Sequence, residues 1–137
     1  MINTVIDTNI FISGIHWHKG KPHFVLRLFQ NRKIAVIFSE HLLSELVKKL
    51  VIIDKRYGFN PAVGHEWIYL LKTNAHFVPS IPKIEICRDK KDNMVLGTAL
   101  AGEAEYIITG DKNLLDIKKY KKIKIVTAKD FLKEAAG

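Results

Sequence analysis

Short apolar runs alternate along this chain with stretches in which apolar residues recur at helical spacing. The apolar runs predict strands at residues 2–6, 34–38, 106–109 and 123–126, and a weaker strand at 76–78. The helical spacing predicts helices over residues 22–30, 40–51, 61–73, 92–101 and 130–136. Ser39 precedes the second of these helices as an N-cap, Pro61 opens the third, and Gly102 ends the fourth.

Strands that alternate with helices are typical of an α/β fold, in which right-handed crossovers cover both faces of a parallel sheet. We therefore expect a three-layer α/β/α sandwich around a central, mostly parallel sheet of about five strands. Residues 54–60 and 78–86 have the composition of surface connections. Because the sequence contains no repeat, low-complexity tract or linker, residues 1–137 are predicted to form a single domain.

The charge of the chain indicates the kind of partner to expect. Its 22 Lys and Arg residues outnumber 14 Asp and Glu residues, and the resulting net charge of +8 favours a polyanion such as nucleic acid. Cys87 is the only cysteine, so neither an internal disulfide nor a zinc cluster built on cysteines can form. No signal-like start and no apolar run of about 20 residues is present. We expect a cytoplasmic protein that is neither secreted nor embedded in a membrane.

Acidic residues follow the predicted strands at the edge where α/β proteins bind ligands. Asp7 comes directly after the first strand, and Asp111 follows the strand at 106–109. Asp92 lies at a predicted helix start, and Glu45 lies near the second turn of the helix after the second strand. Because ligands bind outside the carboxyl ends of parallel strands, we expect these four carboxylates to converge.

Four converging carboxylates repel one another unless protons or cations intervene. Mg²⁺ or Mn²⁺ would relieve the repulsion, since hard cations take oxygen ligands and bind substrate phosphates through their remaining positions. Each acid also has a purely structural alternative: Asp7 and Asp92 as helix caps, Glu45 as a solvated helix residue, Asp111 as a turn residue. Their joint placement at one sheet edge favours a shared site that cleaves phosphodiesters.

Four segments carry a resemblance to a known family. They are VIDTNIFIS at the start, SEHLLSEL around Glu45, RDKKDNMVLGTALAGEAEYIITGDKNLL, and the closing KIVTAKDFL. In these segments the chain resembles the PIN-domain nucleases, specifically the small stand-alone type often found as the toxin of a toxin-antitoxin pair. The third segment is the most specific, because it joins two acidic motifs through a helix and a strand.

The resemblance assigns roles to individual residues. It implies that Asp7, Asp92 and Asp111 are metal ligands, directly or through water, and that Glu45 completes the acidic quartet. Supporting roles fall to three further residues: Asn9, which would orient Asp7, Thr109, whose hydroxyl would bond near Asp111, and Asp89, an additional acid of this branch. Asp116 is expected at the surface.

The resemblance also implies an activity and its partners. It predicts an endoribonuclease in which water attacks phosphorus and leaves a 5′-phosphate and a 3′-hydroxyl. A small antitoxin protein and a second copy of the chain are the expected protein partners. The alternative is an inactive member of the fold that serves as an RNA-binding or protein-interaction module. Other α/β classes fit less well: a haloacid dehalogenase phosphatase needs a second Asp where this chain has Asn9, and no glycine-rich nucleotide loop occurs.

Three further groups of residues remain open. A lysine cluster is a candidate phosphate track or a solvated edge: Lys118, Lys119, Lys121, Lys122 and Lys124. The triplet His16, Trp17 and His18 falls in a predicted loop, where the histidines are a weak zinc pair and Trp17 either stacks on a base or packs on its own domain. A helical stripe is expected in the core rather than at an interface: Trp67, Ile68, Leu70 and Leu71.

Overall fold

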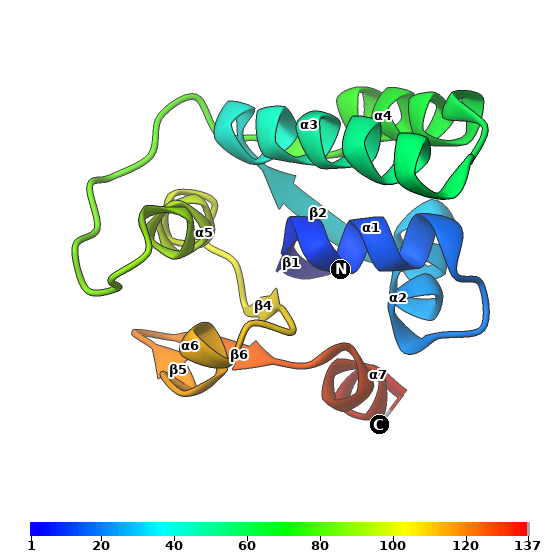
Figure 1. The fold of residues 1–137 in the computed structure, drawn as a ribbon. Coiled ribbons are helices and arrows are strands. Elements are labelled where there is room, and N and C mark those ends of the chain that lie inside the picture. Colours follow the sequence, from blue (N-terminus) through cyan, green and yellow to red (C-terminus); the bar gives the residue numbers. More distant parts are fainter. Residues whose placement is uncertain (137) are drawn as a thin grey trace.

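A central sheet with helices on both faces makes up the computed structural model, which describes residues 1–136 (Figure 1). The strands are β1 (Ile2–Ile6), β2 (Ile34–Phe38), β3 (His76–Phe77), β4 (Tyr106–Ile108), β5 (Lys119–Tyr120) and β6 (Ile123–Val126). The helices are α1 (Thr8–His16), α2 (Lys21–Gln30), α3 (Glu40–Tyr57), α4 (Pro61–Asn74), α5 (Lys90–Ala101), α6 (Lys112–Leu115) and α7 (Ala128–Ala136).

The strand order β3-β2-β1-β4-β6-β5 explains the layers. The chain moves along the sheet from β1 to β3 and then returns from β3 to β4, and right-handed crossovers in opposite directions place their helices on opposite faces. In Figure 1, α5 lies on one side of the sheet and α1, α2 and α7 lie on the other. The predicted α/β/α sandwich is confirmed.

The first five strands of this order pair in parallel, as predicted, and only β5 runs antiparallel to its neighbour β6. In register, Ile6 at the end of β1 is beside Ile108, and Ile108 is beside Val126. The carboxyl ends of β1, β4 and β6 therefore form one edge of the sheet. The antiparallel strand β5, which makes a sixth, was not predicted.

The core fills the space between the sheet and its helices. Phe11 of α1, Phe38 of β2 and Phe131 of α7 are fully buried, and Phe11 meets Phe38 edge to face at a centroid distance of 5.5 Å. Leu71 of the predicted α4 stripe is fully buried. Its neighbours on the stripe are partly buried and pack against the core: Trp67, Ile68 and Leu70. The expectation that this stripe belongs to the core is confirmed.

Several predicted boundaries were wrong. The helix predicted over residues 40–51 continues to Tyr57 and ends at Gly58, whose φ of 67° is the left-handed conformation that glycine adopts without strain. Residues 54–57 are therefore helix and not a connection. The helix predicted from Asp92 begins two residues earlier at Lys90. The structure also contains α1 and α6, which the apolar pattern did not predict.

None of the helices in the described part of the chain is long and apolar enough to cross a membrane.

Candidate active site

Acidic side chains from four elements meet at the carboxyl edge of the sheet. Asp7 follows β1, Asp111 follows β4, Asp92 lies in the first turn of α5, and Glu45 lies in the second turn of α3. They line one cavity of about 200 Å³, together with Asn9, Lys49, Asp89, Lys91 and Val95. The structure thus brings together the four acids on which the sequence analysis centred.

The carboxylate of Asp7 is held by side chains and does not cap a helix. Asp7 occupies the N-cap position of α1, yet its side chain makes no capping hydrogen bond. Instead the Thr109 hydroxyl donates to Asp7 Oδ2 at 2.7 Å, and the same hydroxyl accepts the backbone N–H of Asp111 at 3.0 Å. One hydroxyl group therefore connects the carboxylate after β1 to the backbone after β4.

Asp92 is also free of a capping role. The N-cap of α5 is Asp89, whose Oδ1 accepts the backbone N–H of Lys91 at 2.9 Å. Asp92 is only 4% exposed, and within residues 1–136 its Oδ2 has no hydrogen-bond partner. Asp111 caps α6 through Oδ1, which accepts the backbone N–H of Asn113 at 2.8 Å. A buried carboxylate oxygen without a partner needs a proton or a cation.

The acids perturb one another electrostatically. Burial, which has the largest effect, and the neighbouring carboxyl groups of Asp111, Asp89 and Asp7 together raise the pKa of Asp92 to about 7. Burial also raises the pKa of Asp7, an effect partly offset by the hydrogen bond from Thr109 and the charge of Lys49. The cluster therefore resists carrying its full negative charge when no cation is bound.

Two lysines enter this cavity that the sequence analysis did not identify. Lys49 Nζ lies 2.9 Å from Glu45 Oε1 and donates to Asn9 Oδ1 at 3.0 Å and to Thr8 Oγ1 at 3.3 Å. Lys91 Nζ lies 3.9 Å from the same Glu45 oxygen. The sequence contains one indication of Lys49: it follows Glu45 by four residues on a helix. This spacing normally indicates an ion pair at the surface and not a residue of an active site. The Asn9 side chain thus accepts a hydrogen bond from Lys49, and the proximity of the Asn9 backbone lowers the pKa of the Asp7 carboxyl.

The donor set suits a hard divalent cation. In residues 1–136, no group of three or more His, Cys, Asp or Glu side chains has the spacing to hold a metal ion directly. The cavity nevertheless offers carboxylate oxygens from Asp7, Asp92 and Asp111, one of them buried and without a partner. Mg²⁺ keeps several of its waters and is bound through only one or two carboxylates, so water-mediated ligation fits these residues.

The predicted lysine cluster lies on the β5–β6 hairpin. Lys121 and Lys122 form its turn, directly before the start of β6 and thus at the amino edge of the sheet, opposite the acids. Lys124 pairs with Glu134 at 3.3 Å. Lys118 and Lys119 lie nearer the acidic edge, and Asp116 is exposed, as expected.

The triplet at residues 16–18 does not form a zinc pair. His16 is the last residue of α1 and not part of a loop, and its Nε2 lies 3.0 Å from the Asp54 carboxylate. The His18 ring bonds to the carbonyl of Ile15. Trp17 packs edge-on against the rings of His16, Tyr57 and Phe59. Of the two alternatives for Trp17, these contacts favour packing on its own domain over stacking on a base.

Comparison with known proteins agrees with this geometry. The PIN domain matches residues 3–113, which contain all four candidate acids. An uncharacterized protein of Methanocaldococcus jannaschii, MJ1680, is 33% identical over 146 aligned residues, which cover 97% of this chain and 91% of that protein. PIN domains are typically nucleases, and they generally use divalent metal ions. Because the match covers most of the chain and includes the acidic edge, this protein belongs to the PIN-domain family.

Proposed function

We propose that this protein is a metal-dependent endoribonuclease whose active site is the cavity lined by Asp7, Glu45, Asp92 and Asp111. The observation that carries the proposal is that neither Asp7 nor Asp92 caps a helix: Asp7 occupies the N-cap position of α1 without a side-chain capping hydrogen bond, and the N-cap of α5 is Asp89 and not Asp92. Their carboxylates remain available for a cation, and Asp92 has a buried oxygen that lacks any partner in residues 1–136.

Mg²⁺ or Mn²⁺ would be held by Asp7, Asp92 and Asp111, directly or through water, with Glu45 completing the set. When bound, such an ion binds the scissile phosphate, activates water and stabilises the leaving oxygen. The remaining chemistry of the site belongs to the chain itself. Thr109 fixes Asp7 relative to Asp111, and Lys49 holds Glu45 in place while it neutralises part of the acidic charge.

The test is a cleavage assay on single-stranded RNA, structured RNA and DNA with Mg²⁺, Mn²⁺ or EDTA. Wild-type protein should cleave RNA only with a divalent ion, and Asp7→Asn should abolish cleavage. In the metal-free protein Asp7→Asn should also raise the melting temperature slightly, because it removes one repelling charge. Persistent cleavage by Asp7→Asn would refute the site, and a large loss of stability would instead favour a structural role for Asp7.

The alternative is an inactive PIN domain that binds RNA or a protein. The observation that favours it is that the acids are not preformed as a direct three-ligand site and that Lys49 occupies part of the cavity. Equal inactivity of wild type and Asp7→Asn, with RNA binding retained by both, would support this alternative. The toxin role, the antitoxin partner, the homodimer and the cytoplasmic location stay predictions that rest on the sequence analysis.

A further inference from the structure

Two hollows continue the acidic cavity along the surface between α3 and α5. The first, of about 570 Å³, shares Glu45, Lys49 and Lys91 with the acidic cavity. The second, of about 670 Å³, shares His41, Lys90 and Met94 with the first. Because the spaces share these residues, they lie next to one another along the surface, and we call the row of three the α3–α5 trough.

The middle of the trough is strongly basic. Its walls carry Lys48, Lys49, Lys90 and Lys91 against a single acid, Glu45. Glu45 is already paired with Lys49, and for Lys48 and Lys90 no carboxylate lies within 4.0 Å in the described part of the chain. Crowded ammonium groups without partners attract a polyanion. The trough also runs past the amino ends of α3 and α5, which add positive partial charge.

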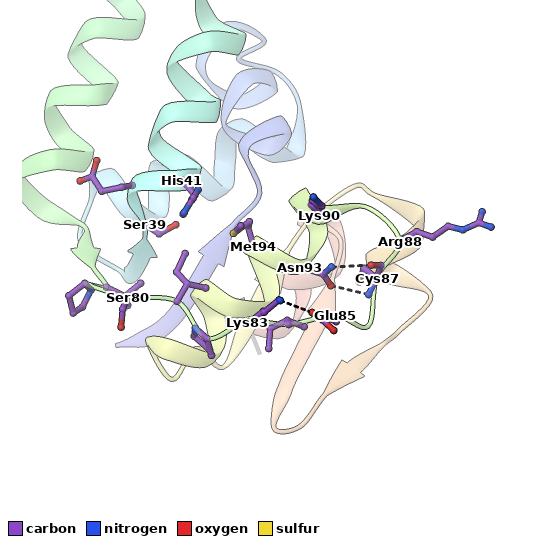
Figure 2. A pocket seen from close by; sticks show the side chains of 16 residues that line it. Ser39, His41, Ser80, Lys83, Glu85, Cys87, Arg88, Lys90, Asn93 and Met94 are labelled. Atoms are coloured by element: carbon purple, nitrogen blue, oxygen red, sulfur yellow. Dashed lines mark hydrogen bonds and ion pairs between the residues drawn. The ribbon is translucent and has the colours of Figure 1, made fainter.

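The far hollow has a fixed and partly apolar wall (Figure 2). The loop between β3 and α5 is held to α5 by Asn93, whose side chain bonds to both the N–H and the carbonyl of Cys87, at 2.9 and 3.0 Å. Ile81 of the same loop packs against Gly97 of α5. Figure 2 shows Met94 and His41 facing the space between these walls. Lys83 is paired with Glu85 at 3.0 Å, so this part of the wall is close to neutral.

We propose that the α3–α5 trough binds a single strand of RNA that leads away from the scissile phosphate. Lys48, Lys90 and Lys91 contact its phosphates, and the far hollow receives a base against Met94. The inference rests on the proposed nuclease function and names the path of its substrate. The pattern matches the chemistry of a single strand, in which charged phosphates alternate with apolar base faces, and the trough begins at the candidate active site itself.

The experiment measures binding of a fluorescein-labelled ten-nucleotide RNA to the Asp92→Asn protein, so that cleavage does not interfere. The salt dependence of affinity is compared with that of the same protein carrying K48A and K90A. Each phosphate contact on a single strand contributes about 0.7 to the slope of log affinity against log salt. The double substitution should therefore flatten the slope by about 1.4 and weaken binding on the order of tenfold at 0.1 M salt.

A matched control removes two exposed lysines of α7, with K129A and K133A, because α7 packs against α2 and lies away from the trough. This control loses the same charge, and its salt slope should change by less than half of the change expected for K48A/K90A. Melting temperatures of all three proteins verify that they fold. An unchanged slope in K48A/K90A, or an equal loss in both double variants, would overturn the proposal.

The two proposals fail separately. If wild-type protein cleaves RNA but K48A/K90A binds like its parent, the nuclease stands and the trough serves another ligand. Binding of an acidic peptide that is lost in K48A/K90A, without an effect of these substitutions on RNA binding, would overturn the proposal and identify a protein partner as that ligand. If no cleavage occurs but binding depends on Lys48 and Lys90, the trough stands and the nuclease function fails.

Discussion

At the scale of the residue, one hydroxyl group organises the candidate site. Thr109 is fully buried, donates to Asp7 and accepts from the backbone of Asp111. A buried hydroxyl with both roles filled has a single orientation, so it fixes the carboxylate to which it donates. Groups that orient metal ligands in this way are typically needed for full affinity and activity.

Thr109→Val should therefore reduce kcat/KM and Mn²⁺ affinity by about 10- to 100-fold, since it keeps the shape and removes both hydrogen bonds. The matched control is Thr4→Val, because Thr4 is equally buried and donates one hydrogen bond to the carbonyl of Ala35 in the same sheet. Both variants should lose about 1 kcal/mol of stability. Equal activity of the two variants would show that Thr109 has only a structural role.

The raised pKa of Asp92 makes the stability of the metal-free protein depend on pH. The folded state holds this proton up to about pH 7, whereas the unfolded chain releases it near pH 4, so the folded state binds more protons between these values. Stability from this group is full below about pH 4 and is lost as the pH rises through about 7. The Asp92→Asn substitution removes the titrating carboxyl group, so this pH-dependent loss of stability disappears. In EDTA, the unfolding free energy of the variant relative to wild type should rise by a few kcal/mol from pH 5 to pH 8; a constant difference would contradict the assignment.

At the scale of the element, the sequence predicted the strands better than the helices that carry the site. β1 and β4 are largely apolar runs bounded by polar residues. The carboxyl ends of these predicted strands were sufficient to predict where the acids converge. The α1 sequence TNIFISGIH is rich in β-branched residues and contains a glycine, so its own helix propensity is poor. Burial of Ile10, Phe11 and Ile15 decides its conformation, and local patterns do not register such tertiary contacts.

The short elements were missed for a different reason. β5 has two residues and exists through its pairing with β6, and α6 is a single turn capped by Asp111. Neither element is long enough to show a periodic pattern of apolar and polar residues. The entry of Lys49 into the acidic cavity depends on how α1 packs against α3, which sequence spacing does not specify.

The contact between α5 and the preceding loop gives a test at the same scale. A Cβ on Gly97 would lie 2.2 Å from Ile81 Cγ2 and 3.0 Å from the carbonyl of Pro82, so Gly97→Ala must displace the loop. We expect a loss of about 1–3 kcal/mol. Gly64 in α4 is the control, because its Cβ would meet nothing closer than 3.4 Å and alanine should stabilise that helix by up to about 1 kcal/mol. Chemical denaturation measures both, and stabilisation by Gly97→Ala would show that the loop is not held there.

At the scale of the whole molecule, the positive charge is divided between opposite edges of the sheet. The trough lysines lie beside the acids, and Lys121 and Lys122 lie at the amino edge. If the hairpin lysines also contact RNA, a long strand must reach both edges while a short one reaches only the acidic edge.

The double substitution K121A/K122A tests whether a long strand reaches the hairpin lysines. Its salt slope for a ten-nucleotide RNA should match that of the parent, and for a strand several times longer the slope should flatten by about 1.4 if both lysines bind phosphates. Fluorescence anisotropy with the two lengths distinguishes these outcomes. Flattening with the short RNA would mean that the strand takes a path over the hairpin and not through the trough.

The contact between His16 and Asp54 bears on the acids at the opposite end of α1. It joins the last residue of α1 to Asp54 of α3. At the opposite end of α1, Lys49 of α3 donates hydrogen bonds to Thr8 and Asn9. The two helices therefore contact each other at both ends of α1, which is about 13 Å long at 1.5 Å per residue. We therefore expect a substitution at this aromatic-lined contact to change how α1 and α3 lie against each other, and with it the separation of the Asp7 and Glu45 carboxylates at the opposite end of α1.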